Sequence, residues 1–148
     1  DSMNAYRIAG HQHVYEIERE LSLLADRDIK VTFTPHVIPL CRGILTTIYA
    51  QLNAGQTLKT VEEAYRAFYK DDVFVRVFGP ETPQVSTNVR ASNFCNISLN
   101  MDERTGKLIV VSLIDNLVKG QAGSAVQNMN IMFGLDETTG LSHPGFYP

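Results

Sequence analysis

The sequence predicts an α+β domain with a mixed, mainly antiparallel sheet and helices on one face. Helical and strand-like patterns alternate irregularly along the 148 residues instead of repeating as strand–helix pairs. A hairpin pattern over residues 96–114 makes two successive strands antiparallel. A chain of this length buries about two-thirds of its unfolded surface, which is enough for one core. We therefore expect one domain with a C-terminal appendage.

Charge and composition exclude several classes of partner. Thirteen basic and sixteen acidic residues give a formal charge of −3, and neither sign forms a run of five. Nucleic-acid and membrane-surface binding are therefore not expected. No segment approaches the roughly 18 apolar residues of a membrane span, and residues 1–10 lack a signal-peptide pattern. We expect a cytoplasmic protein whose Cys41 and Cys95 are free thiols.

Two histidines precede the first predicted helix, which covers residues 14–25. His11 and His13 lie at its entrance, where imidazole suits proton transfer near neutral pH. Glu16, three residues after His13, is placed to orient or charge-pair with it. The ordinary alternative is that both histidines are exposed polar residues. No metal site is predicted, because no second ligand cluster accompanies the His-x-His pair.

The next segment combines a strand pattern with an irregular loop. Residues 29–33 alternate apolar and polar side chains, which predicts a half-buried strand ending at Pro35. Arg42 lies in the irregular segment that follows, and its planar fork suits a carboxylate or an acyl phosphate. A solvated loop arginine is the alternative. Residues 44–52 resume a strand-like composition.

The middle of the chain predicts one helix and three strands. Thr60 and Glu63 form a capping-box pattern that opens a helix over residues 61–70, with aromatic side chains on its buried face. Residues 73–78 alternate as a strand, and residues 79–88 form a loop. Residues 96–101 and 107–114 then form the hairpin, with Gly106 in the turn over residues 102–106. The second hairpin strand is almost continuously aliphatic, as in a strand buried on both faces.

A glycine-bearing stretch follows this strand. A small-residue loop over residues 119–123 is expected to lead into a helix that ends at Gly134. Gly120 and Gly123 leave no bulk over the first helical turn, so its N–H groups can approach an anion or amide. The alternative is that these glycines permit close packing of helix on strand.

Four stretches together resemble the N-acetyl-gamma-glutamyl-phosphate reductase family, which is related to aspartate-semialdehyde dehydrogenase. The main one is IDNLVKGQAGSAVQNMN, followed by MFGLDETTGL, which is similar to the family's C-terminal signature. The others are GHQHVYEIEREL, FTPHVIPLCRGILTTIYA and SNFCNI, in the family's order. The chain departs from the family at three positions, where Gln12 replaces Arg, Tyr15 replaces Pro and Ala91 replaces Gly.

The resemblance implies a glyceraldehyde-3-phosphate-dehydrogenase-like C-terminal domain. Residues 1–115 would form the substrate-binding and dimerisation domain, which self-associates through its sheet. Residues 116–148 would form a helix and tail that pack on an absent N-terminal nucleotide-binding domain. The family's nucleophilic cysteine lies upstream, and neither Cys41 nor Cys95 stands in its motif. The chain alone is therefore expected to be inactive.

The implied reaction is the NADP-dependent reduction of N-acetyl-glutamyl 5-phosphate to N-acetyl-glutamate 5-semialdehyde in arginine biosynthesis. The absent N-terminal domain would bind most of the NADP. The expected catalytic residues are His13, His11 and Glu16; the substrate-binding residues are Arg42, His36 and Asn93; the cofactor-facing residues are Lys119, Gly120, Gly123 and Asn128. Two alternatives are a related semialdehyde dehydrogenase acting on an aminoadipate or aspartyl acyl phosphate, and a catalytically silent dimerisation module.

Overall fold

A computed structural model describes residues 2–145 and divides the chain into two compact units, residues 1–41 and 42–148. Each unit is described by itself. The last helix belongs to the second unit together with the sheet. The domain boundary predicted at residue 115 stays a prediction. No helix within residues 2–145 combines the length and apolarity needed to cross a membrane.

The first unit contains one helix and a small antiparallel ladder. α1 spans His13–Ala25, as the apolar spacing predicts, and β1 (Asn4–Ala5) pairs with β2 (His36–Val37). The predicted strand at residues 29–33 is wrong, although burial alternates along it. Its N–H groups bond to side chains of α1 instead of a neighbouring strand: Ile29 donates to Ser22 Oγ at 2.9 Å and Val31 to Glu18 Oε1 at 3.1 Å.

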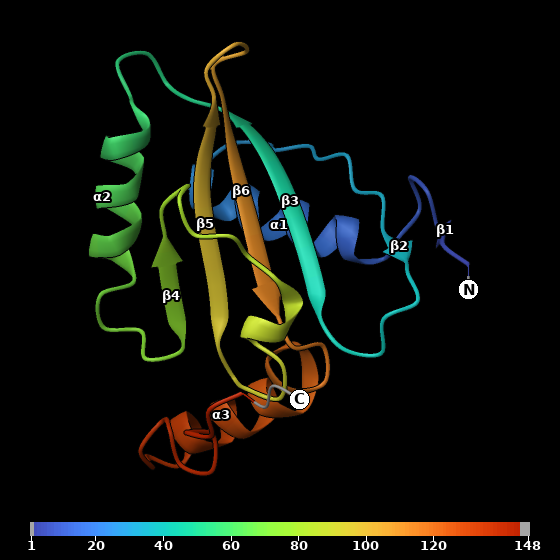
Figure 1. The fold of residues 1–148 in the computed structure, drawn as a ribbon, viewed down its shortest axis with the longest axis vertical. Coiled ribbons are helices and arrows are strands. Elements are labelled where there is room, and N and C mark those ends of the chain that lie inside the picture. The colour runs from blue at the N-terminus through green and yellow to red at the C-terminus, as the bar shows by residue number, and fades with distance from the viewer. Residues whose placement is uncertain (1, 146–148) are drawn as a thin grey trace. The chain divides into compact units, whose positions relative to one another are not determined.

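The second unit is built on a four-stranded sheet in the order β3-β6-β5-β4 (Figure 1). The strands are β3 (Ile44–Gln51), β4 (Val75–Phe78), β5 (Cys95–Asp102) and β6 (Lys107–Ile114). β6 pairs antiparallel with β3 and β5, and β4 runs parallel to β5. The prediction of a mixed, mainly antiparallel sheet is confirmed. Gly106 turns the β5–β6 hairpin with a φ of 65°, as expected.

The core lies between the sheet and α2 (Leu58–Phe68). Four buried side chains form its centre: Ile97, Leu99, Leu108 and Val110. Val61, Tyr65 and Tyr69 pack against them, since residues four apart share one face of a helix. Phe68 belongs to the same predicted aromatic face, but it is 77% exposed in the last turn of α2 and meets the Tyr69 ring edge-on at a centroid distance of 4.8 Å.

The start of α2 corrects another prediction. The N-cap is Thr57, and Thr60 is the third helical residue. Thr60 N–H donates to Thr57 Oγ1 at 3.3 Å, and Thr57 N–H donates to Thr60 Oγ1 at 2.9 Å. Thr60 at the third helical position thus takes the place of the glutamate in the usual capping box. The predicted capping box from Thr60 to Glu63 is therefore wrong by one helical turn.

The other face of the sheet is covered by a loop. Asn96 and Ser98 of β5 are buried, and residues 79–94 cross over them with one short helical turn, η1 (Ser86–Asn88). Asn96 Nδ2 donates to Gln84 Oε1 at 3.1 Å. The loop therefore satisfies polar side chains that burial would otherwise penalise.

Leu99 tests the position of the core. Leu99→Ala should lower the free energy of unfolding of the second unit by about 2–5 kcal/mol, because a buried leucine leaves a cavity. Urea denaturation measures the loss. Leu135, which is 51% exposed, provides the matched Leu→Ala control, and equal losses for both variants would contradict the described core.

Candidate functional site

The carboxylate of Asp115, just after β6, joins three segments that are distant in sequence. Its Oδ2 accepts from Arg42 Nη2 at 2.6 Å and from Ala91 N–H at 2.7 Å. Its Oδ1 accepts from the N–H groups of Leu117 at 2.8 Å and Val118 at 3.0 Å. Asp115 is fully buried. We call these five residues the Asp115 junction, and every partner in it is a donor.

Two electrostatic effects act on this carboxyl group in opposite directions. Burial raises the pKa of Asp115, while hydrogen bonds from Arg42, Ala91, Val118 and Leu117 lower it. The hydrogen bonds prevail, and the net pKa lies below the ordinary value. Asp115 is therefore ionised at neutral pH and forms a buried ion pair with Arg42.

Asn116 extends the junction to the start of β3. Its Oδ1 accepts from Gly43 N–H at 2.7 Å. Gly43 has a φ of 109°, a conformation that glycine adopts without strain. A Cβ on Gly43 would lie 3.2 Å from Ser86 Cβ. Arg42 and Gly43 are thus both fixed by the residues that terminate β6.

The segment after Asn116 is helical, and the predicted small-residue loop is wrong. A π-helical turn, η2 (Val118–Ala122), continues into α3 (Gly123–Met132). Asp115 supports this turn, because its side chain binds the first two N–H groups and its carbonyl accepts from Gly120 N–H at 2.9 Å. The N–H groups of Leu117 and Val118 are thus occupied by the protein's own carboxylate. The predicted end of the helix agrees with Gly134, which has a φ of 67°.

Gly123 has a packing role. It is buried, and a Cβ there would collide with Asn93 Oδ1 and lie 2.7 Å from Val118 O. This geometry favours the packing interpretation for Gly123. Asn93 is itself 1% exposed, and its Oδ1 has no hydrogen-bond partner among the described residues. Gly120, by contrast, is exposed.

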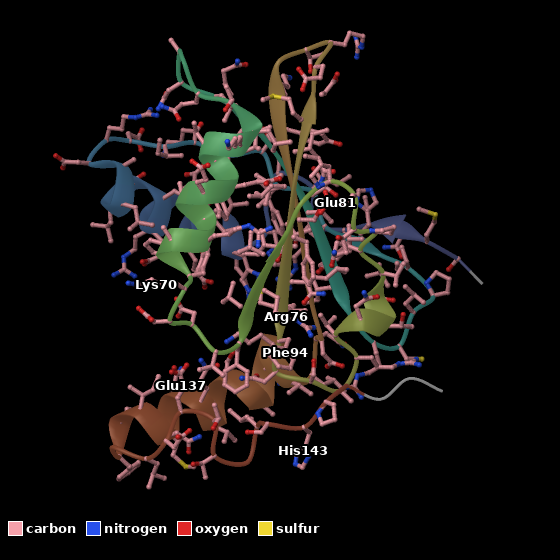
Figure 2. The ribbon with its side chains drawn as sticks, turned by 60° about the vertical axis from the view of Figure 1, so that its left-hand side comes forward. Lys70, Arg76, Glu81, Phe94, Glu137 and His143 are labelled. Carbon is pink, nitrogen blue, oxygen red and sulfur yellow. The ribbon has the colours of Figure 1, made fainter. Side chains whose placement is uncertain are left out.

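A polar network on α3 was not found from the sequence. Gln127 Oε1 accepts from Lys119 Nζ at 2.6 Å and from Asn93 Nδ2 at 3.0 Å. Gln127 Nε2 donates to Glu137 Oε1 at 2.6 Å, and Figure 2 places Glu137 beside this helix. The network unites two predicted site residues, Asn93 and Lys119. The only sequence signal was that Lys119 and Gln127 lie about two helical turns apart.

A second arginine holds the loop that carries Asn93. Arg76 of β4 stacks over Phe94, 4.1 Å from the ring centroid (Figure 2). Its Nε donates to Asn96 Oδ1 at 2.8 Å and its Nη2 to Asn88 O at 3.1 Å. Burial lowers the pKa of Arg76. This arginine links β4, β5 and the loop, and the strand pattern alone gave no signal for it.

In the first unit, His11 is buried among aromatic rings. It is 6% exposed and meets Tyr6, Phe33 and His13 edge-on, at centroid distances of 5.5, 5.4 and 4.6 Å. Its Nδ1 accepts from His13 N–H at 3.2 Å, which assigns the neutral ring's proton to Nε2. Burial lowers the pKa of His11, with further lowering from His13 and Arg7 and an opposing contribution from Glu16.

His11 also lines an open cavity of about 290 Å³ with Tyr15, Glu18 and Phe33. His13 is the first residue of α1 and is exposed, as is Glu16. The structure describes no hydrogen bond between Glu16 and His13. His36 is exposed in β2, with its Nδ1 3.1 Å from Thr34 O. His11 and His13 are thus brought together, whereas Glu16 and His36 are not bonded to them.

The predicted residues of the second unit fall into two groups. Asn93, Lys119 and Gly123 meet around the start of α3. Arg42 lies in the Asp115 junction, and its side chain is 28% exposed. Asn128 is exposed on α3. The sequence predicts only that a strand ends before Asp115, and it predicts no role for the Asp115 carboxylate.

Comparison with known proteins relates the chain to one family of enzymes. Residues 1–116 match the model of the semialdehyde dehydrogenase dimerisation domain. The whole chain is 52% identical to part of the N-acetyl-gamma-glutamyl-phosphate reductase of Geobacter metallireducens and covers 43% of its length. Against the reductase of Brachyspira hyodysenteriae, identity is 54% over 93% of the chain and 39% of that protein. The chain thus spans about two-fifths of the relatives it matches.

Solved structures show the same fold at low identity. Aspartate semialdehyde dehydrogenase from Francisella tularensis has a TM-score of 0.68 and 14% identity, over 89% of this chain and 39% of that one. Aspartate semialdehyde dehydrogenase II from Vibrio cholerae has a TM-score of 0.65 and 15% identity, over 83% of this chain and 37% of that one. These likenesses confirm the predicted fold.

Gly123→Ala tests the packing at the start of α3. The substitution should destabilise the second unit by about 1–3 kcal/mol, because the added methyl group collides with Asn93 and Val118. Gly120→Ala, whose new Cβ would lie 3.3 Å from its nearest neighbour, serves as the control in urea denaturation. A neutral Gly123→Ala variant would contradict this packing.

The His11 environment predicts a pH dependence. A histidine whose pKa is lowered by folding stabilises the protein above its unfolded pKa of about 6.5 and loses that contribution as pH falls toward the folded pKa. The urea midpoint of the first unit should therefore decrease as the pH is lowered from about 7.5 to about 5.5. His11→Phe should flatten this dependence, whereas His36→Gln should leave it unchanged. An unchanged slope in His11→Phe would show that another group is responsible.

Proposed function

The chain belongs to the semialdehyde dehydrogenase family, whose dimerisation domain it contains, and from this premise we propose that it is part of an N-acetyl-gamma-glutamyl-phosphate reductase. The proposed reaction is reduction of N-acetyl-glutamyl 5-phosphate to N-acetyl-glutamate 5-semialdehyde in arginine biosynthesis, in the cytoplasm. The observation that carries it is identity near 50% to reductases of that name along the whole chain.

The same observation ranks the alternatives. The solved aspartate semialdehyde dehydrogenases are only 14–15% identical, so they support the fold and give no support for an aspartyl substrate. The relatives that are 51–52% identical to this chain carry the name of the acetylglutamyl enzyme. An aminoadipate substrate and a silent dimerisation module have no observation in their favour.

We assign proton transfer to His13. It is exposed at the first turn of α1, where a substrate can reach its imidazole. His11 positions His13. The His11 ring packs against Tyr6 and Phe33, and its Nδ1 accepts a hydrogen bond from the His13 N–H. A neutral, buried His11 fixes the backbone of His13 without competing for the proton. Glu16, on the first turn of α1, remains a proposed contributor to catalysis.

Arg42 is assigned to an anionic group of the substrate. Its side chain is partly exposed, and its Nε is buried without a hydrogen-bond partner among the described residues. A buried donor without an acceptor is costly, so a substrate oxygen there is favourable. His36 and Asn93 remain proposed contributors to substrate binding. The family's phosphate-displacing cysteine belongs to the part of the enzyme outside this chain.

NADP is the proposed cofactor, and it supplies the reducing equivalents when it is bound. Lys119, Gly120 and Asn128 are the residues proposed to face it, and two of them are exposed. Lys119 already donates to Gln127, which leaves further ammonium protons for an anion. Gly123 contributes through packing, since it is buried under Asn93. Most of the cofactor contacts are assigned to the nucleotide-binding domain.

Two apolar surfaces fit the proposed partners. β3 is an edge strand with exposed Leu45, Ile48 and Tyr49, which suits association with a second copy through the sheet. The other surface is on α3 and the turn after it, where Met132, Phe133 and Leu135 are exposed. We assign this surface to the nucleotide-binding domain. The 148-residue chain alone is accordingly proposed to be inactive.

His13→Ala in the complete reductase tests the proposed function. It should lower kcat by about 10²- to 10⁴-fold, because general acid–base catalysis contributes a rate factor of that size. The variant should fold like the wild-type enzyme. NADPH oxidation is measured with the acetylglutamyl, aminoadipyl and aspartyl phosphates in parallel. His143→Ala, in the exposed tail, is the control. Turnover of another acyl phosphate in preference to the acetylglutamyl one would overturn the substrate assignment.

A further inference from the structure

Asp115 terminates β6 and makes no contact with solvent. Removing a carboxylate from water is costly unless every lone pair is satisfied, and here four donors satisfy both oxygens. Three of these donors are backbone N–H groups, which any residue except proline would provide at those positions. The fourth is the guanidinium of Arg42, whose identity matters.

Arg42 is only partly used by the protein. Asp115 engages Nη2 at 2.6 Å, while Nε is buried and unpartnered among residues 2–145. The side chain remains 28% exposed. A purely structural ion pair of arginine with a carboxylate is commonly bidentate, with two parallel N–H···O bonds. Here the second Asp115 oxygen is directed to the helix entry instead, which leaves part of the guanidinium available to another acceptor.

We propose that Asp115 is a positioning residue that holds the Arg42 guanidinium toward an anionic group of the substrate and, through its other oxygen, fixes the entry of the helix that carries Lys119. This inference rests on the proposed function, because it takes Arg42 as a substrate ligand. Asp115 touches no substrate itself. It aligns the start of β3 and the start of η2 through one rigid carboxylate.

Asp115→Asn is a sharp test, because asparagine keeps the shape and replaces one acceptor oxygen with an NH₂ donor. All four partners are donors, so one side of the junction must meet a donor whichever way the amide is oriented. In the complete reductase this variant should raise KM for the acyl phosphate by roughly tenfold or more, with a smaller change in kcat. Asp102→Asn is the matched control, since Asp102 accepts from Thr105 and Arg104 in the β5–β6 turn.

A double-mutant cycle separates positioning from general structural support. Arg42→Lys should also raise KM, since an ammonium cannot reproduce the planar fork. If Asp115 acts through Arg42, Asp115→Asn should add little to KM on the Arg42→Lys background. Additive increases, or a wild-type KM in Asp115→Asn, would overturn the proposal while leaving the reductase activity intact. A wild-type KM in Arg42→Lys would overturn the proposal together with the substrate role given to Arg42, and the reductase activity would still stand.

A second measurement covers the case in which Asp115→Asn does not fold. In the wild-type 148-residue chain, the Arg42 Nε–H resonance is followed by NMR while N-acetyl-glutamate is added. The proposal predicts a saturable shift of this resonance that is larger than the shift of the Arg76 Nε–H, which already donates to Asn96. No shift at Arg42 at saturating N-acetyl-glutamate would overturn the proposal.

Discussion

The buried ion pair between Asp115 and Arg42 is the constraint on which the second unit depends. A fully buried carboxylate with four donors can exist only where β3, the loop before β5 and the helix entry all arrive together. Breaking such a pair by removing one partner is costly, because the remaining charge stays buried. The junction therefore links residues that lie just beyond the ends of three paired strands, where the sheet pairing stops at Ile44, Cys95 and Ile114.

The two faces of the sheet support this junction in different ways. One face is apolar and packs on α2, and burial of Leu99 and Val110 dominates its energy. The other face buries Asn96 and Ser98 under a loop held by Arg76. That loop delivers the Ala91 N–H to Asp115 and Asn93 to Gln127. The polar face thus positions the candidate site, and the apolar face stabilises the sheet that carries it.

Much of the fold could be predicted from the sequence, because hydrophobic period and turn chemistry are local. The β5–β6 hairpin, Gly106, Gly134 and the tyrosines of α2 follow from spacing alone. The errors arise where a side chain replaces a backbone partner. Glu18 and Ser22 take N–H groups that a strand at residues 29–33 would have paired, and Asp115 converts a glycine-bearing loop into a helical turn. The contacts of Gln127 and Arg76 could not be predicted from local spacing, because their hydrogen-bond partners lie 8 to 34 residues away along the chain. The roles proposed for His13 and Arg42 rest on family resemblance, since neither spacing nor composition distinguishes them from solvated residues.

The most direct measurement replaces the aligned segment of the Geobacter metallireducens reductase with this chain. The two are 52% identical over 149 residues, so the chimera can be compared with its active parent. Acetylglutamyl-phosphate-dependent NADPH oxidation is then assayed. If this chain is the substrate and dimerisation part of such a reductase, the chimera should keep kcat/KM within about tenfold of the parent. A folded chimera that binds NADPH and does not reduce the acyl phosphate would contradict the account.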